Sequence, residues 1–536
     1  MSRPATVPGL VSFCSLFALA ASVVVPASLA GSSPAPVRRP NILMAVADDW
    51  SFPHAGAYGT SWVRTPNFDR VAREGLLFTH AYTPVAKCSA SRACLLTGRQ
   101  PWQLEAGFTH WNYFPPNYGT YAEALLAAGY FTGFTGKGWA PGIAVDAAGQ
   151  PRQVLGRDFA ARKAKPPTTG ISGVDYAANF TDFLDAAPKG QPWCFWYGGN
   201  EPHRDYEFKS GVTKGGKLLS DIPKVPGYWP DNEEVRHDML DYALEVEYFD
   251  THLGRMLAEL ARRGQLDNTL VIVTADNGMP FPRSKGQCYE IANHLPLAIR
   301  WPGGIAHPNR RIDDFVGFTD VAPTLLAVAG ATPAASLPTM TGREFLALLR
   351  GNGSGLVDAT RDHVLIGRER HDPGRPHNQG YPVRGIVADG LLYLRNFAPD
   401  RWPAGNPETG YLDVDTSPTK SSILTAHRAN PADPFWALAF GKRGEEELYD
   451  LGPDTACVAN LSDRPAYAGR KTALAARLLA ELRTQGDPRL VGPNPDIFDT
   501  YRFANPAIND LYERYMAGQT PLPSWCIPSD VDNHPK

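Results

Sequence analysis

Four short segments along the chain have the pattern of β-strands. They are residues 41–47, 130–135, 192–197 and 269–275. Residues 41–47 form a continuous apolar run of the kind found in strands covered on both faces, and 269–275 is the clearest strand. Residues 192–197 are aromatic-rich and β-prone, and 130–135 is a weaker strand. Between them, residues 91–96, 121–128 and 237–263 have helical character, and the last stretch repeats its apolar residues at helical spacing. This alternation predicts an α/β fold with a mostly parallel sheet and helices on both faces.

Polar residues stand shortly after each of the four predicted strands. In chain order they are Asp48, Asp49, Lys137, His203, Asp276 and Asn277. Ligands of open α/β sheets bind beyond the carboxyl ends of the strands, so we expect these side chains to meet at one edge. Carboxylate and amide oxygens favour calcium or magnesium over zinc, and the two acidic pairs can share one cation. The alternative is that each strand ends in an ordinary turn, which favours Asp and Asn.

The first 30 residues have the pattern of a secretory signal peptide. Arg3 precedes a mostly apolar run, residues 10–25, which is followed by Pro26 and the small residues 27–30. The alternative is an uncleaved membrane anchor, for which the run is short. No later stretch is apolar enough to span a bilayer. We predict a secreted or periplasmic protein, with a flexible lead-in at residues 31–40 and no stable membrane insertion after cleavage.

Composition narrows the class of protein and its partners. The 536 residues include 52 Lys and Arg against 55 Asp and Glu, for a formal net charge of -3, and 43% are hydrophobic. The near-neutral balance predicts no nucleic-acid partner, and the apolar share excludes a disordered chain. Of seven cysteines, Cys14 leaves with the signal peptide, and the other six include no CxxC pair of the zinc-ribbon type.

Cys88 stands where a loop enters a predicted short helix. The residues from 83 to 99 are TPVAKCSASRACLLTGR. A nucleophile at a helix N-terminus is well placed to face an anion, because the free backbone N–H groups and the helix dipole both favour negative charge there. A lone cysteine is more often a small core residue. The loop context favours a functional cysteine here.

This segment resembles the signature of the type I sulfatases, Cys-x-Pro/Ala-x-Arg followed by Thr-Gly. That family also has an Asp-Asp pair after its first strand, a Gly-Lys lysine, a Pro-His histidine, an Asp-Asn pair and a later Lys or Arg. The chain matches these positions in the same order with Asp48 and Asp49, Lys137, His203, Asp276 and Asn277, and Lys285. The resemblance covers most of the chain from Asn41 to about Cys526.

The resemblance implies an alkaline-phosphatase-like α/β fold. A catalytic domain with the mostly parallel sheet would span residues 41–357. From 358 to 536 the pattern shifts to short strands, such as 390–396 and 446–450, and to a helix at 471–483. This part resembles the smaller C-terminal sulfatase subdomain, an antiparallel sheet with one helix.

The resemblance also implies a modified nucleophile and a metal. A formylglycine-generating enzyme would convert Cys88 to formylglycine, and the hydrated aldehyde would attack the sulfur of the substrate. One calcium ion would bind the sulfate and this nucleophile. Its ligands would be Asp48, Asp49, residue 88, Asp276 and Asn277.

Four basic residues have implied roles around the sulfate. Arg92, Lys137 and Lys285 would offset charge on the sulfuryl oxygens, and His203 would protonate the leaving group. The alternative for each basic residue is a solvated surface charge.

Two positions depart from the family pattern. Trp139 replaces the histidine that usually lies two residues after the Gly-Lys lysine. That histidine normally contacts the formylglycine. Without it, either another group, such as His110, assists as the base, or the covalent sulfate intermediate breaks down by a different route. Ala90 replaces the commoner proline, which the signature allows, and leaves the maturation enzyme open.

Four motifs are similar to the sulfamidase, or heparan N-sulfatase, group. They are residues 200–204, 276–282, 381–384 and 447–450. They favour a sulfated sugar substrate, N-sulfated or O-sulfated, of the glycosaminoglycan type. The predicted strand 364–370 leads into a loop rich in Arg and His, in which Arg370 and His371 are predicted substrate contacts together with His110. A solvated charged turn is the alternative.

The sequence therefore predicts a secreted, calcium-dependent sulfatase of sulfated sugars. Three alternatives stay open. The first is a phosphodiesterase or phosphonate-ester hydrolase of the same superfamily, and the second is a sulfatase for small aryl or alkyl sulfates. The third is a catalytically silent binder of sulfated glycans, which Trp139 makes conceivable.

Overall fold

The computed structural model describes residues 1, 12, 39–332 and 340–532. The chain divides into two units, residues 1–38 and 39–536, and the fold below is that of the second. The predicted signal peptide, apart from residues 1 and 12, and the predicted lead-in up to residue 38 lie outside the described residues. Among the described residues, no helix combines the length and apolar character that a membrane crossing requires.

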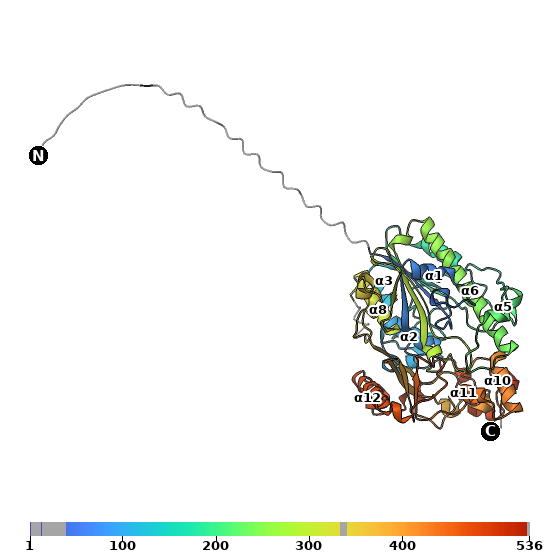
Figure 1. Cartoon of the computed structure of the whole chain (residues 1–536). Coiled ribbons are helices and arrows are strands. Elements are labelled where there is room, and N and C mark those ends of the chain that lie inside the picture. The colour runs from blue at the N-terminus through green and yellow to red at the C-terminus, as the bar shows by residue number, and fades with distance from the viewer. Residues whose placement is uncertain (2–11, 13–38, 333–339, 533–536) are drawn as a thin grey trace. The chain divides into compact units, whose positions relative to one another are not determined.

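A large mixed sheet forms the centre of the second unit (Figure 1). Its strands are β1 (Asn41–Ala47), β2 (Leu76–Tyr82), β4 (Phe131–Gly136), β6 (Arg157–Asp158), β7 (Trp193–Gly198), β8 (Thr269–Ala275), β9 (His294–Arg300), β10 (Arg310–Ile312) and β11 (Val316–Gly317). Their order is β10-β2-β9-β8-β1-β7-β4-β6, with β11 beside β2. β1 pairs in parallel with β7 and β8, and β7 pairs in parallel with β4. β9 is antiparallel to both of its neighbours. The four strands predicted from the sequence are confirmed as β1, β4, β7 and β8.

Helices cover both faces of this sheet because its central strand buries both of its own faces. In β1, Ile42, Met44 and Val46 belong to one apolar core, and Leu43 and Ala45 belong to the other. Helices α2 (Cys88–Thr97), α3 (Tyr121–Ala127) and α8 (Val321–Ala329) pack on the first side, and α1 (Pro66–Arg73), α4 (Tyr176–Ala186) and α6 (Glu233–Arg262) on the second. The predicted α/β fold is confirmed.

The long helix α6 begins for local reasons. The Asn232 side chain accepts a hydrogen bond from the backbone N–H of Val235, and Glu233 and Glu234 lie in the first turn. Both features favour a helix start, because they satisfy a free N–H group and complement the helix dipole. The helix begins four residues before the predicted stretch and ends one residue before its predicted end.

A second, separate sheet is formed by later residues. It is antiparallel, in the order β12-β13-β14-β15. Its strands are β12 (His363–Arg368), β13 (Val383–Ala388), β14 (Leu391–Asn396) and β15 (Glu446–Asp450). Helix α12 (Ala468–Thr484) contributes Leu474, Leu478 and Leu482 to the core that lies beside this sheet.

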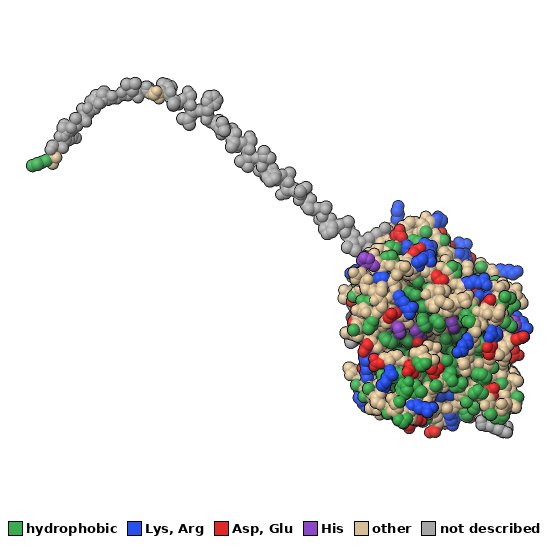
Figure 2. All heavy atoms as spheres, in the orientation of Figure 1, with side chains coloured by type: hydrophobic (Ala, Val, Ile, Leu, Met, Phe, Trp, Pro, Cys, Tyr) green, Lys and Arg blue, Asp and Glu red, His purple; other side chains and the backbone are tan. Residues whose placement is uncertain are grey.

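Acidic and basic side chains are mixed over the visible face of the molecule (Figure 2), in keeping with the balanced composition.

Candidate functional site

The parallel strands bring their carboxyl ends to one edge, and backbone pairing continues just past them. The Asp48 N–H donates to the Glu201 carbonyl at 3.1 Å, and the Asp276 N–H donates to the Ala47 carbonyl at 3.0 Å. The Lys137 N–H donates to the Gly198 carbonyl at 2.8 Å. Segments far apart in the sequence are therefore held in register where the predicted polar residues begin.

Two backbone conformations at this edge are left-handed. Gly136, at the end of β4, has φ 73°, and a Cβ there would lie 2.0 Å from the Gly198 carbonyl oxygen. Only glycine fits at this crossing, which sets the position of Lys137. Asp49 has φ 77°, a conformation that Asp tolerates better than most side chains. Such conformations are often found at functional sites, where the surrounding structure enforces them.

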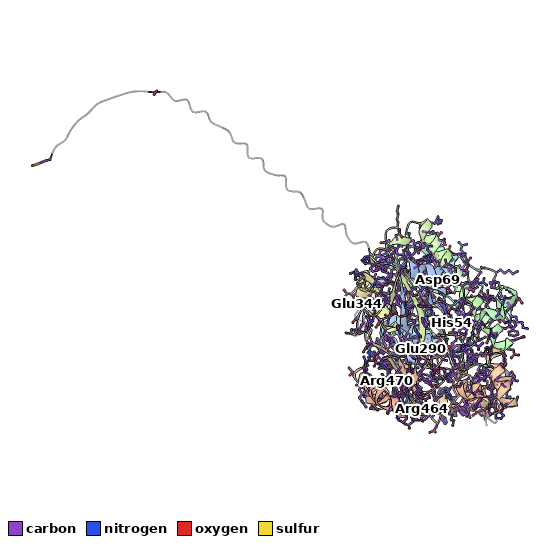
Figure 3. All side chains as sticks on the ribbon, viewed as in Figure 1. His54, Asp69, Glu290, Glu344, Arg464 and Arg470 are labelled. Atoms are coloured by element: carbon purple, nitrogen blue, oxygen red, sulfur yellow. The ribbon has the colours of Figure 1, made fainter. Side chains whose placement is uncertain are left out.

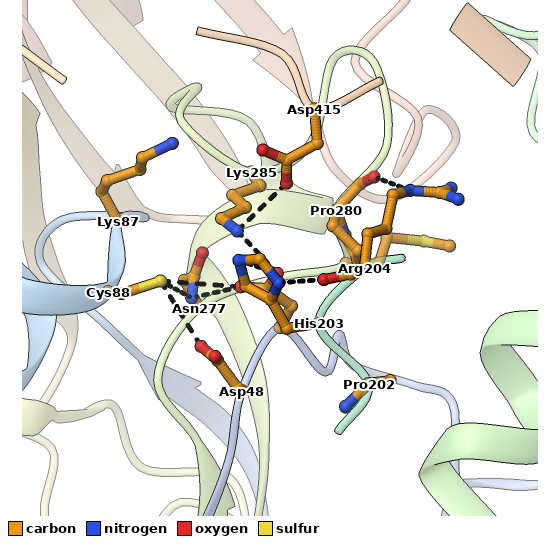
Figure 4. Close-up of polar contacts among 12 residues, drawn as sticks. Asp48, Lys87, Cys88, Pro202, His203, Arg204, Asn277, Pro280, Lys285 and Asp415 are labelled. Carbon is orange, nitrogen blue, oxygen red and sulfur yellow. Dashed lines mark hydrogen bonds and ion pairs between the residues drawn. The ribbon is translucent and has the colours of Figure 1, made fainter. Parts of the chain in front are cut away.

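Cys88 is the first residue of α2 and is 1% exposed. Its Sγ lies 3.4 Å from Asp48 Oδ1, and 3.9 Å from both Asp49 Oδ1 and Asn277 Nδ2 (Figure 4). Burial, reinforced by the Asp48 charge, raises the pKa of the Cys88 thiol far above its ordinary value. The unmodified residue is therefore a neutral thiol at physiological pH, and a weak nucleophile and metal ligand.

Oxygen ligands converge beside this sulfur. One ligand atom from each of Asp48, Asp49, Cys88 and Asp276 lies within 4.8 Å of the others. Asn277 Nδ2 donates to Asp49 Oδ1 at 2.9 Å and to Asp276 Oδ1 at 2.5 Å, whereas its buried Oδ1 has no hydrogen-bond partner. Turning the amide by half a turn would direct that oxygen into the space between the carboxylates, where a cation would bind all of these oxygens. This donor set fits a hard cation such as calcium.

Three cations neutralise the three carboxylates. Lys137 Nζ lies 2.5 Å from Asp48 Oδ2, Lys285 Nζ lies 2.7 Å from Asp49 Oδ2, and Arg92 Nε lies 2.8 Å from Asp276 Oδ2. Burial alone would raise the pKa of Asp48, but the cations around it, above all Lys137, hold that pKa well below its usual value. The cluster therefore keeps Asp48 ionised although it is buried.

His203 is held at the rim of this cluster. Its Nδ1–H donates to the Arg204 carbonyl at 2.5 Å, and Nε2 lies 4.0 Å from Asp49 Oδ2. Arg204 is itself fixed by Asp238, at 2.6 and 2.8 Å, and by the Pro280 carbonyl at 2.8 Å. The imidazole therefore points Nε2 towards the cluster, and with 37% of its side chain exposed it can also meet a ligand from outside.

A pocket of about 300 Å³ opens onto Cys88. It is lined by Lys87, Cys88, His110, Trp111, Lys137, Ala140, Pro141, His203, Lys285, Asp372, Asp415 and Trp525. Five of these residues are site residues predicted from the sequence. Lys87 adjoins Cys88, and Asp372 lies in the predicted Arg- and His-rich loop, so both had a local signal. Asp415 and Trp525 had none, because distant parts of the chain bring them here.

Asp372 connects three of the pocket residues. It pairs with Lys87 Nζ at 2.5 Å and with His110 Nδ1 at 3.1 Å, and it accepts a hydrogen bond from Trp111 Nε1 at 2.9 Å. Burial lowers the pKa of His110 to about 4, although the Asp372 charge acts in the opposite direction. His110 is therefore neutral at physiological pH, with Nδ1–H facing the carboxylate.

The lining of the pocket does not include Arg370, His371 or Trp139, which the sequence analysis singled out. Arg370 and His371 are 0% exposed, and Arg370 donates to the Tyr501 carbonyl and lies over the Phe503 ring. Both side chains are buried and neither lines the pocket, so substrate contact by Arg370 and His371 stays a prediction. Trp139 donates to the Ser89 carbonyl at 2.9 Å, which ties it to the first turn of α2.

Some buried or half-buried ionisable groups belong to the core and not to the site. His54 forms a 3.1 Å hydrogen bond with the Tyr242 hydroxyl and packs against Trp62. Glu290 lies 2.6 Å from His294 Nδ1. His54 and Glu290 are labelled in Figure 3. Neither residue lines the pocket at Cys88, so burial by itself does not mark the site.

Comparison with known proteins agrees with this geometry. A family model described as Sulfatase matches residues 40–331. Human N-sulphoglucosamine sulphohydrolase is 30% identical over 476 residues, covering 80% of this chain and 87% of that protein. An ulvan-active sulfatase of Formosa agariphila is 28% identical over 474 residues, covering 86% of this chain and 83% of that protein.

A solved structure determined in complex with its substrate, D-glucosamine-2-N,6-O-disulfate, has the same fold. Its TM-score is 0.61 at 19% identity, and the match covers 85% of this chain and 99% of that one. With the family model matching more than half of the chain and the human relative matching most of it, the resemblance first seen around Cys88 is confirmed. The chain belongs to the sulfatase family of sulfuric ester hydrolases.

Proposed function

We propose that this protein is a secreted, calcium-dependent sulfatase that removes N-sulfate or O-sulfate groups from sugars of the glycosaminoglycan type. Its nucleophile would be formylglycine, made from Cys88 by a formylglycine-generating enzyme. The observation that carries the proposal is the position of Cys88. Its sulfur lies at the start of a helix, within 3.4 to 3.9 Å of two carboxylates, and opens onto a pocket.

The properties of the thiol support a modified residue. Cys88 Sγ is buried beside two carboxylates, and burial together with the Asp48 charge disfavours the thiolate that a cysteine nucleophile needs. When present, formylglycine supplies the nucleophile and calcium supplies a Lewis acid for the sulfate oxygens. The proposed calcium ligands are Asp48, Asp49, residue 88, Asp276 and Asn277.

The protein's own side chains would bind and orient the sulfate. Lys137 and Lys285 line the pocket, and their positive charge would attract the sulfuryl oxygens. Arg92 is fully buried behind them, bound to Asp276 and to the Lys137 carbonyl at 2.7 Å, and so fixes the base of the cluster. His203, with its Nδ1–H held by the Arg204 carbonyl, would act in its imidazolium form and donate the Nε2 proton to the leaving atom, becoming a neutral imidazole.

The relatives support a sulfated sugar as substrate. One is named an N-sulphoglucosamine sulphohydrolase and another an ulvan-active sulfatase, and a structural neighbour was solved with a glucosamine disulfate. We propose the same class here. We also propose residues 41–357 as the catalytic domain and 358–536 as the C-terminal subdomain, with the second sheet beginning at β12. Cleavage after residue 30 and export remain part of the proposal.

Mass spectrometry across residue 88 tests the nucleophile. Protein produced with a formylglycine-generating enzyme should show conversion of Cys88 and should release sulfate from N-sulfoglucosamine. Release should disappear in Cys88→Ala. The matched control is Cys94→Ala, because Cys94 is a second buried cysteine of α2 that does not line the pocket. That variant should keep conversion and sulfate release.

The outcomes separate the alternatives. Conversion of Cys88 with sulfate release from O-sulfated sugars, but not from N-sulfoglucosamine, would support a sulfatase whose substrate is an O-sulfated sugar. Preference for small aryl sulfates, or for phosphate diesters, would replace the sugar substrate by one of those classes. An unmodified thiol under conditions that convert a control sulfatase would overturn the proposed nucleophile and favour a silent glycan binder.

A further inference from the structure

Two tryptophans stand side by side at the pocket that contains Cys88. Trp111 follows the segment with His110, whereas Trp525 belongs to the C-terminal segment, and both line the pocket. Their ring centroids are 5.8 Å apart and their planes differ by 13°, which is a stacked arrangement. Both side chains are half-buried. A pair of half-buried aromatic rings at a pocket otherwise rich in charge calls for a functional explanation.

Trp111 is held in place against a backbone cost. Its φ is 55°, in the left-handed region that a bulky L-residue rarely adopts. Its Nε1–H donates to Asp372 Oδ1 at 2.9 Å, and its carbonyl accepts from the Ala504 N–H at 2.7 Å. Strain of this kind persists only where neighbouring groups enforce it, and it is concentrated at functional sites. The single polar group of the indole is satisfied within the protein, which leaves the ring face not stacked on Trp525 for an apolar contact.

Trp525 is tied to the charged cluster through the chain. Its carbonyl accepts a hydrogen bond from Thr416 Oγ1 at 2.7 Å. The preceding residue, Asp415, lies 3.1 Å from Lys285 Nζ, and Lys285 pairs with Asp49. A short series of contacts therefore fixes the distance between the aromatic pair and the place proposed for the sulfate.

The pocket combines surfaces that few ligands match. It offers flat apolar rings from Trp111 and Trp525, a carboxylate from Asp415 that can accept hydrogen bonds, and ammonium groups that can bind an anion. A pyranose sulfate has one apolar C–H face, hydroxyl groups around its edge and a sulfate anion. A hydrocarbon sulfate would offer the Asp415 carboxylate no donor beyond Lys285 Nζ, whereas a sugar hydroxyl would add a second hydrogen bond. The volume of about 300 Å³ is at the lower end for ligand pockets, which span about 300 to 1,000 Å³.

We propose that Trp111 and Trp525 form a sugar subsite, on which the C–H face of a pyranose ring of the substrate stacks while its sulfate lies at residue 88. The inference rests on the proposed function for the class of substrate. It adds two specificity residues that act on the sugar and not on the sulfate. Asp372 is the positioning residue that orients Trp111.

Binding without turnover tests this subsite separately from catalysis. Calorimetry on the Cys88→Ala protein would compare N-sulfoglucosamine with inorganic sulfate, an anion that lacks a ring. Adding Trp525→Ala should raise the dissociation constant for the sugar about tenfold and leave that for sulfate unchanged, because only the sugar stacks. The matched control is Trp402→Ala, a half-buried tryptophan that does not line the pocket.

A second variant guards against a folding defect. Trp111→Phe keeps an aromatic face but loses the bond to Asp372, so it should weaken sugar binding less than Trp111→Ala does. Equal sugar affinity in Trp525→Ala and its parent, or an equal loss for sugar and sulfate, would overturn the subsite.

The two proposals fail in different ways. Converted wild-type protein that releases no sulfate, while sugar binding still depends on Trp525, would refute the proposed function and leave the subsite. If sulfate release from sugars were unchanged by substitution of either tryptophan, the subsite would be refuted and the proposed function would stand.

Discussion

Two clusters of buried charge differ in one instructive respect. The first surrounds Cys88. The second, named here the Arg384 network, consists of Arg384, Arg489, Glu369 and Asp487, and it includes a residue of the second sheet, because Arg384 belongs to β13. Arg384 bonds Asp487 at 2.7 and 3.1 Å and lies 2.9 Å from Glu369, which Arg489 binds at 2.6 and 2.7 Å. Among the described residues, none of the four leaves a buried side-chain nitrogen or oxygen without a partner.

The cluster at Cys88 is incomplete by the same measure. Asn277 Oδ1 and Arg92 Nη2 have no hydrogen-bond partner, the latter lying 3.6 Å from Asp48 Oδ1. This cluster opens onto a pocket, whereas no member of the Arg384 network lines that pocket. Burial and charge are common to both clusters. What distinguishes a site is unmet bonding capacity together with access.

The largest expected effect is a loss of activity on substitution at the cluster around Cys88. His203→Gln should lower sulfate release by about 100- to 10,000-fold, the range for loss of a general acid, because the leaving atom would receive no proton. Since 37% of the side chain is exposed, the melting temperature should barely change. Steady-state kinetics and thermal unfolding would measure both. Unchanged kcat would remove His203 from the proton transfer.

The Arg384 network is tested by measuring the free energy of unfolding instead of activity. Arg384→Met should lower the free energy of unfolding by about 3 to 5 kcal/mol, because Asp487 would remain buried without its partner. Denaturant unfolding would measure this, and the activity of the folded fraction should be unchanged. Adding Asp487→Leu should recover part of the loss. A stable Arg384→Met protein that had lost activity would erase the distinction between the clusters.

Calcium should stabilise the cluster at Cys88. At a free concentration one hundred times its dissociation constant, a ligand that binds only the folded state adds about 2.7 kcal/mol. The melting temperature of wild-type protein should therefore rise with calcium and fall with a chelator. Asp276→Asn should reduce this response, whereas Arg384→Met should keep it. A melting temperature indifferent to calcium in wild type would count against the proposed metal site.

A smaller effect concerns His54, which is buried without access to the pocket. Burial lowers the pKa of His54 to about 3, from about 6.5 in the unfolded chain. As the pH falls below about 6.5, His54 binds a proton in the unfolded chain but not in the native state. The free energy of unfolding therefore decreases as the pH is lowered, by about 2 kcal/mol at pH 5. Unfolding of His54→Phe should lose less stability between pH 7 and pH 5. Parallel curves for both proteins would contradict this.

Local patterns in the sequence were sufficient for the central strands and their polar ends. β1, β7 and β8 are mostly apolar runs, and β4 has a weaker strand pattern. Because parallel strands align their carboxyl ends, Asp48, Lys137 and Asp276 were expected to meet. The antiparallel strands β2 and β9 were not predicted. Both contain polar or ionisable residues, such as His80 and His294, that weaken an apolar pattern.

By itself, the sequence determined the family, the chemistry-bearing residues around Cys88 and the α/β fold, because these depend on short motifs and on periodicity within single elements. Only the tertiary structure decided which other side chains share the pocket. Trp525 and Asp415 reach it through long-range contacts, and Arg370 and His371 are excluded from it by burial. The physical reason is that chain segments distant in sequence meet only when the core closes, and a local pattern carries no record of that contact.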